Sequence, residues 1–252
     1  MGTPWPAHRP LRLTCDPWVP DAVCGGTRAV DSVQFHANRI RSAERLRGPE
    51  LPSIYQLKPA FQGVLRPCVR WLARAGVTAN AVTVAAAALS VAVGACVAVW
   101  SDHDWPLLLL PAFLFLRMAF NAVDGMLARE HGMESRLGAI LNELGDVVSD
   151  AALYLPLALV AAFDPRLVVL IVVLAVISEM TGVLGLAFGS RRRYDGPMGK
   201  SDRAAVFGAL GLWLGLGGTG GAWLSVVLGA TALLLAATTV NRARQVLRDG
   251  EG

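Results

Sequence analysis

The chain has 252 residues, of which 54% are hydrophobic and 17% are charged, and its mean hydropathy is +0.48. A soluble domain of this size carries more charge, so the composition argues against a soluble protein and indicates an integral membrane protein. The formal net charge is +4, and a nucleic-acid partner is not expected. The four cysteines show neither CxxC nor metal-ligand spacing, so we expect reduced thiols and no disulfide framework.

Residues 1–54 are rich in Pro, Gly and Arg and show no sustained hydrophobic periodicity. We interpret them as a disordered N-terminal extension. The first thirty residues contain no continuous apolar core followed by a cleavage site, so we expect no signal peptide there.

Residues 55–76 are predicted to form an amphipathic helix that lies on the inner surface of the membrane. Apolar residues recur there at helical spacing, and three arginines form a row of their own. The apolar row is Leu57, Phe61, Val64, Cys68 and Leu72, and the basic row is Arg66, Arg70 and Arg74. A basic flank that only fixes the topology of the chain explains the same residues equally well.

Residues 77–249 are predicted to form one domain of six transmembrane helices. Six apolar segments are long enough to cross a bilayer. They are Ala81–Trp100, Trp105–Asp124, Ala139–Phe163, Leu167–Gly189, Ala204–Gly218 and Ala222–Val240, of which the fifth is short and rich in glycine. The expected fold is therefore an all-α polytopic membrane protein, with a juxtamembrane amphipathic helix before the six spans.

The distribution of Lys and Arg predicts how the chain is oriented. Of the 23 such residues, 21 lie in segments that share one side of the membrane, while Arg166 lies on the other side and Arg117 within a span. The positive-inside rule then places both termini and the loop at 129–136 in the cytoplasm, as in a multi-pass protein of the cell (inner) membrane.

Polar side chains gather on one face of the second predicted span and on one face of the third. The first face has Asn121, Asp124, Gly125 and Ala128, and the second has Gly138, Asn142, Asp146 and Asp150 at intervals of four residues. The two helices are consecutive and antiparallel, so two carboxylates and two carboxamides are expected to converge near the membrane surface. Acids near helix ends are often merely solvated, but a carboxylate one or two turns into a membrane is costly and usually functional.

Oxygen ligands clustered in this way suit Mg²⁺ or Mn²⁺, which commonly serve phosphate chemistry. Asp124 and Asp146 are the expected metal ligands. Arg129 is placed to hold a phosphate oxygen through charge-assisted hydrogen bonds. The two faces therefore predict a metal-dependent site for phosphate groups.

The same residues resemble the signature of the CDP-alcohol phosphatidyltransferase family. DG stands at 124–125 and AR at 128–129, and fixed gaps of eight, three and three residues then lead to Gly138, Asn142 and Asp146. A pattern of this length is far more specific than a short glycine motif. The resemblance covers about residues 55–245, and it includes GVTANAVT at 76–83 and GKSDR at 199–203.

The resemblance implies six helices, a divalent metal pair, and a reaction in which an acceptor hydroxyl displaces CMP from a CDP-linked lipid such as CDP-diacylglycerol. It assigns metal binding to Asn121, Asp124, Asn142 and Asp146, and donor binding to Asn80, Thr83, Gly125, Ala128, Arg129, Ser135 and Gly138. It also makes Asp146 the general base, since a carboxylate beside a metal can take the proton of the acceptor as the diphosphate is attacked. Members of the family are often dimers, so a homodimer is considered as well.

Two positions depart from the pattern of the family. Asn121 and Asn142 stand where the family usually has Asp, so the site loses two negative charges. We expect weaker metal binding, or one bound ion in place of two. Glu143 and Asp150 are auxiliary candidates, but Glu143 points about 100° away from Asn142 and Asp150 lies one turn deeper.

Five further charged residues are candidates for a role. Arg117 and Glu179 lie at similar depth within the second and fourth spans, so we expect them to form an intramembrane ion pair. Lys200 and Arg203 open the fifth span beside the expected site. Together with Arg193, they are candidates for binding an acceptor alcohol that carries a phosphate. Anchoring the loop to anionic lipid is the alternative role for its arginines.

The leading hypothesis is a membrane enzyme of phospholipid synthesis, which transfers a phosphatidyl or related phospho-alcohol group from a CDP-linked lipid to an alcohol. A small membrane transporter is the alternative from a different class, but the acids lie at one side and form no path across the membrane. A catalytically inactive member of the family is the third hypothesis, because of the two asparagines.

Overall fold

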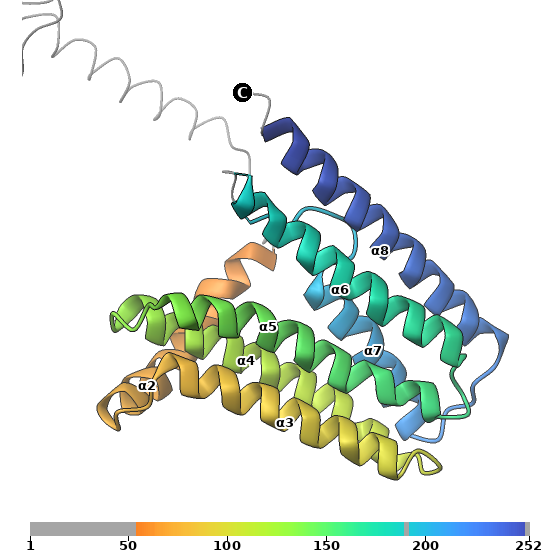
Figure 1. Ribbon diagram of the computed structural model, residues 1–252. Helices are drawn as coiled ribbons and strands as arrows, with labels where there is room; N and C mark the ends of the chain where they lie inside the picture. Colours follow the sequence, from red (N-terminus) through yellow and green to blue (C-terminus); the bar gives the residue numbers. More distant parts are fainter. Residues whose placement is uncertain (1–53, 189–191, 250–252) are drawn as a thin grey trace, which may run out of the picture. The chain divides into compact units, whose positions relative to one another are not determined.

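The computed structural model describes residues 54–188 and 192–249, and within those ranges it contains helices and no strand (Figure 1). The chain divides into two units, Met1–Gln56 and Leu57–Gly252, and the second contains everything described below except the first turn of α2. Almost all of the predicted N-terminal extension, and the loop residues 189–191, lie outside the described residues. The helices are α2 (Ile54–Arg74), α3 (Ala79–Val99), α4 (Leu109–Glu130), α5 (Arg136–Tyr154), α6 (Pro165–Ala187), α7 (Lys200–Gly215) and α8 (Ala222–Asp249), with 3-10 helices η2 (Trp105–Leu108) and η3 (Leu155–Leu159).

Four helical segments of the described chain are long and apolar enough to cross a membrane. They are Ala79–Val99, Trp105–Glu130, Pro165–Ala187 and Ala222–Arg248. α7 is too short for that criterion, with 16 residues, and α5 carries several charged residues along its length. The predicted all-helical membrane fold is thus confirmed with four spans, whereas the number six is not established.

Side-chain caps and a proline determine where several helices begin and end. Thr78 and Ser135 immediately precede α3 and α5, and their hydroxyl oxygens accept hydrogen bonds from backbone N–H groups three residues later, at 3.2 and 2.9 Å. Pro156 has no backbone N–H to donate, and α5 passes at Tyr154 into the 3-10 helix η3. The third predicted span is therefore an α-helix only in its first part.

α3 packs closely against α4 and α5, and α6 packs along α8 (Figure 1). At Gly94, α3 comes so near to α5 that an added Cβ would overlap the backbone carbonyl oxygen of Ala152. α7 packs against α4 and η2, where a Cβ on Gly211 would lie 2.9 Å from the carbonyl oxygen of Leu107. Glycines thus allow close helix contacts on two sides of the bundle.

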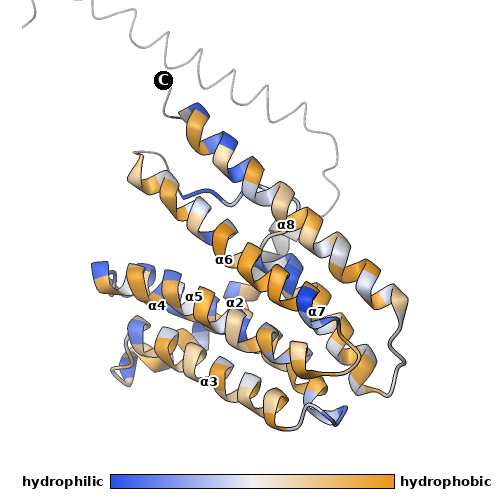
Figure 2. Cartoon of the chain, turned by 45° about the vertical axis from the view of Figure 1, so that its right-hand side comes forward, coloured by the Kyte–Doolittle hydropathy of each residue, from blue (hydrophilic) through white to orange (hydrophobic). Residues whose placement is uncertain are grey.

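Hydrophobic residues occupy most of the length of these helices, as the colours of Figure 2 show. A second, smaller core joins α2 to α3 and α4 around the fully buried Val69. On other faces of α2, Val64 is 77% and Trp71 66% exposed, and Cys68 is exposed as well. Part of the apolar row predicted for this helix therefore points away from the protein and is free to contact lipid.

Candidate active site

The first part of the site is a polar contact between α3 and α4. The hydroxyl of Thr83 on α3 donates a hydrogen bond to Asp124 Oδ2 on α4, at 2.9 Å. Asp124 is buried, with 6% of its surface exposed. Next to it, an added Cβ on Gly138 of α5 would lie only 2.7 Å from Asn80 Oδ1 of α3. The glycine thus allows the start of α5 to approach the polar side chains of α3.

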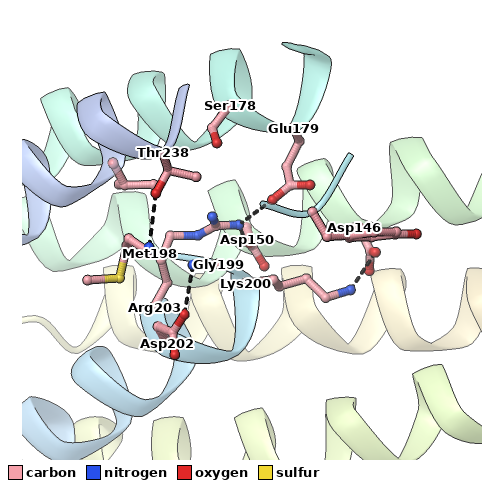
Figure 3. Close-up of polar contacts among 12 residues, drawn as sticks. Asp146, Asp150, Ser178, Glu179, Met198, Gly199, Lys200, Asp202, Arg203 and Thr238 are labelled. Carbon is pink, nitrogen blue, oxygen red and sulfur yellow. Dashed lines mark hydrogen bonds and ion pairs between the residues drawn. The ribbon is translucent and has the colours of Figure 1, made fainter. Parts of the chain in front are cut away.

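The carboxylate of Asp146 on α5 is contacted by side chains from two other helices, α4 and α7. Asn121 on α4 donates from Nδ2 to Asp146 Oδ1 at 3.4 Å, and Arg117 Nη2 lies 3.3 Å from the same oxygen. Lys200, the first residue of α7, contacts the second carboxylate oxygen (Figure 3). Since Asn121 precedes Asp124 by one helical turn, these contacts bring the acidic faces of α4 and α5 together.

The donor set fits a divalent ion with oxygen ligands, although it is sparse. Asp124, Asp146 and the carboxamide of Asn121 converge, while Asn142 is half-buried one turn before Asp146 on α5. Carboxylate and carboxamide oxygens are suitable ligands for Mg²⁺ or Mn²⁺. Within the described residues, no three Asp, Glu, His or Cys side chains form a group that could hold a metal ion. The oxygen ligands available here are therefore two carboxylates and the carboxamides of two asparagines.

Other predicted donor-binding residues lie at the end of α4 and at the start of α5. The side chain of Arg129 is exposed and lies over Gly125, where a Cβ would meet its Nη2 at 3.1 Å. Ala128 is half-buried between them and the second core. Ser135, exposed at the start of α5, uses its side chain to cap the helix by accepting from the Gly138 N–H. The guanidinium group of Arg129 is thus exposed at the end of α4.

A second group of charges follows directly, and it corrects one prediction. Arg117 does not pair with Glu179: its Nη1 lies 2.5 Å from Asp150 Oδ1, and Asp150 Oδ2 lies 2.6 Å from Arg203 Nη2. The prediction was wrong because it compared only depths along the two helices. Asp150 and Asp146 on α5 both pair with Arg117.

Glu179 on α6 has three basic partners, two of which the sequence analysis did not single out. Arg203 Nη2 and Arg192 Nη2 each lie 3.1 Å from its carboxylate, and Arg242 Nη1 of α8 lies 3.4 Å away. Arg192 also lies 2.7 Å from Glu143 Oε2. An arginine at the end of an otherwise apolar last span was the available signal for Arg242, and Arg192 was hidden in a run of three arginines.

The chain between α6 and α7 is fastened by backbone hydrogen bonds. The N–H of Arg193 donates to the carbonyl of Gly182 at 3.0 Å, and the N–H of Met198 donates to Thr238 Oγ1 of α8 at 2.9 Å (Figure 3). Gly196 has a φ of +139° and no room for a Cβ beside Thr238. The Arg193 side chain lies 3.8 Å from Asp195.

These bonds carry the start of α7, with Lys200 and Arg203, to the acids of α5, and they position Arg192 between Glu143 and Glu179. Burial by itself lowers the pKa of the Arg192 guanidinium. The hydrogen bond with Tyr194 and the attraction of both glutamates outweigh it and raise the pKa above its ordinary value.

Comparison with known proteins identifies the same family as the sequence motif at residues 121–146. The sequence profile of the CDP-alcohol phosphatidyltransferase family matches residues 76–246. Inner membrane protein YnbA of Escherichia coli (strain K12) is 45% identical over 195 residues, which is 77% of this chain and 96% of YnbA. The phosphatidylinositol phosphate synthase of Mycobacterium marinum is 37% identical over 109 residues, 43% of this chain and 45% of the synthase.

Solved structures show the same fold. The phosphatidylinositol phosphate synthase PgsA1 of Mycobacterium tuberculosis with bound CDP-DAG has a TM-score of 0.62 and 24% identity, covering 71% of this chain and 92% of that one. Its complex with manganese and citrate also has a TM-score of 0.62, covering 72% and 88%. With four apolar helices and an inner-membrane relative, this chain is a multi-pass membrane protein, and it belongs to the CDP-alcohol phosphatidyltransferase family.

Proposed function

We propose that this chain transfers a phosphatidyl group from a CDP-linked lipid, such as CDP-diacylglycerol, to the hydroxyl of an acceptor alcohol and releases CMP. One observation carries the proposal: Asn121 on α4, one turn from Asp124, contacts Asp146 on α5. The two halves of the family motif therefore form one site. The CDP-DAG held by the structural relative supports the choice of donor.

In this reaction, the acceptor oxygen forms a bond to the phosphorus that bears the lipid. The bond from that phosphorus to the bridging oxygen of the diphosphate breaks, and CMP leaves with that oxygen. Asp146 takes the proton of the acceptor hydroxyl, and Lys200 and Arg117 hold its carboxylate in position. Arg129, exposed at the end of α4, binds a phosphate oxygen of the donor.

Asp124 and Asp146, with Asn121 and Asn142, are proposed to hold a divalent ion, Mg²⁺ or Mn²⁺. When bound, this ion neutralises charge on the diphosphate and polarises it. Only two of the four proposed ligands carry a negative charge, and Asp146 is also paired with Lys200 and Arg117, so we propose one ion in place of the two implied by the family pattern. Thr83 keeps the Asp124 carboxylate in place through its hydrogen bond.

We also propose six membrane spans, with both termini and the site on the cytoplasmic side. α5 suits a span because its exposed face is apolar, with Ile140 56%, Leu144 59% and Val148 48% exposed, while Asp146 and Asp150 point inward. Charged residues in spans normally face the protein interior in this way. The basic residues gathered in the segments of one side support the orientation. A homodimer stays a prediction.

The test is CMP release from CDP-diacylglycerol by the purified full chain in detergent. The assay offers a panel of alcohols and phosphorylated alcohols, with Mn²⁺, Mg²⁺ or EDTA. We expect metal-dependent release that falls by about a hundredfold or more in Asp146→Asn, because proton transfer by a positioned base contributes about that much. Asp102→Asn, in the exposed turn before η2, is the matched control and should retain activity.

The alternatives predict different results. An inactive family member, which the two asparagines favour, would release no CMP with any acceptor or metal. A transporter would release none either, but it would show metal-independent ion flux in liposomes. Equal CMP release by the wild type and by Asp146→Asn would overturn the role of Asp146.

A further inference from the structure

The carboxylate of Glu179 lies inside a cluster of three arginine side chains from three different segments. Arg203 comes from the first turn of α7, Arg242 from α8 and Arg192 from the chain before α7, and each guanidinium is 3.1 to 3.4 Å from a Glu179 oxygen. Figure 3 shows Glu179 and Arg203 facing each other across the space between α6 and α7. We refer to Arg192, Arg203 and Arg242 as the arginine cluster.

The arginine cluster is buried and has hydrogen-bonding capacity to spare. Arg203 is 0% exposed and Arg242 is 2% exposed. Nε of each of the three arginines, and Nη1 of Arg203, are buried without a hydrogen-bond partner within the described residues. Converging guanidinium groups with several free N–H donors are the arrangement by which proteins bind phosphate. Here the anion at the centre is a side chain of the protein itself.

The charges around the cluster are already matched by other carboxylates. Arg203 shares Asp150 with Arg117, and Arg192 is also paired with Glu143. A phosphate group entering the cluster would bring about two negative charges close to three carboxylates, in surroundings that screen charge weakly. It would have to displace the Glu179 carboxylate from its partners, and a buried carboxylate without partners is costly.

We propose that Glu179 is a built-in counterion that closes the arginine cluster to phosphate, and that it selects an acceptor alcohol without a phosphate group. The second half of the statement rests on the proposed transferase function, whereas the first half does not. Glu179 acts as a specificity-determining residue: its carboxylate occupies the place that the phosphate of a phosphorylated acceptor would need.

The first half is tested by equilibrium binding of radiolabelled inorganic phosphate to the purified full chain, without donor or metal. We expect no saturable binding by the wild type at millimolar phosphate, and a gain of at least about tenfold in affinity in Glu179→Ala, equivalent to about 1.4 kcal/mol. Glu179→Gln keeps the shape and removes the charge, and it should show a smaller gain. Adding Arg242→Ala to Glu179→Ala should reverse the gain.

Glu130→Ala is the matched control, because it also removes a glutamate paired with an arginine, Arg66, but on the surface. It should not increase phosphate binding. Saturable phosphate binding by the wild type at millimolar phosphate would overturn the proposal. So would a gain of similar size in Glu130→Ala. The wild-type measurement decides against the proposal even where the Glu179 variants do not fold.

The second half is tested by CMP release with paired acceptors, glycerol against glycerol 3-phosphate and inositol against inositol phosphate. We expect the wild type to use the free alcohol of a pair at least about tenfold better, and Glu179→Ala to reduce this preference. Preferential use of the phosphorylated acceptor by the wild type would overturn the selection while leaving the transferase function standing. If no acceptor of any pair leads to CMP release, both the proposed transferase function and the proposed acceptor selection are wrong. The phosphate-binding measurement then still tests whether Glu179 closes the arginine cluster.

Discussion

At the scale of single residues, the position of Arg117 shows how the buried charges depend on one another. Its guanidinium bridges Asp150 and Asp146, and all three residues are largely buried. A buried ion pair adds little net stability compared with apolar residues, but removing one partner leaves an uncompensated charge. Arg117 therefore connects Asp146, the proposed base, to Asp150 on the same helix.

Arg117→Met is expected to destabilise the protein by about 3 to 5 kcal/mol, because two carboxylates lose a partner in the interior. Adding Asp150→Asn should recover part of the loss, since it removes one of the two buried carboxylates whose charge Arg117 no longer balances, although Asp150 keeps its contact with Arg203. Thermal unfolding in detergent measures both. The exchange Arg117→Glu with Glu179→Arg should recover nothing, and recovery by that exchange would contradict the observed pairing.

The carboxamides of Asn121 and Asn142 are neutral, so they limit the negative charge of the site. Asn121 contacts Asp146 directly, so an Asp there places a further negative charge beside the proposed ion. Asn121→Asp with Asn142→Asp is expected to lower the Mn²⁺ concentration for half-maximal CMP release by about tenfold or more, because affinity for hard cations rises with ligand charge. His103→Asp, in the exposed turn after α3, adds charge far from the site and should change nothing. An unchanged or raised Mn²⁺ requirement would mean that these positions do not face the ion.

Much of the site was predictable at this scale, because the gaps of the motif place Asp124 and Asp146 on definite helix faces. The partners of those acids were not. The contact between Lys200 and Asp146 depends on an irregular segment fastened by the hydrogen bonds of Arg193 and Met198. No periodicity in the sequence specifies such a path. The structure shows the contact of Lys200 with Asp146, and acceptor binding by Lys200 stays a prediction.

At the scale of elements, the close packing of α3 against α5 brings Thr83 and Asn80 to the acidic faces. That packing requires Gly94, where any Cβ would overlap the backbone of Ala152. α5 cannot move aside without disturbing Asp146 and Asp150, which lie on the same helix. Helix positions follow well from hydropathy, whereas close contacts of this kind depend on how the helices pack.

Gly94→Ala is expected to lower the stability by about 1 to 3 kcal/mol, the usual cost of forcing extra volume into a packed interior, and to reduce activity as well. Gly229→Ala in α8 is the matched control, because an added Cβ there meets nothing within 4 Å. It should be neutral or slightly stabilising, since alanine favours a helix more than glycine does. Equal unfolding temperatures of the two variants would show that α3 and α5 have room to separate.

At the scale of the whole molecule, the charged residues are arranged so that apolar helices can enclose them. Asp146, Asp150 and Glu179 connect side chains from α4, α5, α6, α7 and α8 in a continuous network of ion pairs. Hydropathy and length predict an all-helical membrane protein because those two properties decide which segments cross a bilayer. They do not determine whether α5, whose acids face inward, or the short α7 crosses the membrane.

The central claim is that α4 and α5 jointly hold a divalent ion beside the diphosphate of a CDP-linked lipid. The most direct measurement is an anomalous difference map at the manganese edge, from crystals of the full chain grown with Mn²⁺ and CDP-diacylglycerol. The account predicts a manganese peak bound by carboxylate oxygens of both Asp124 and Asp146 and in contact with the donor diphosphate. A bound donor with manganese held elsewhere, or held by residues of only one of the two helices, would contradict it.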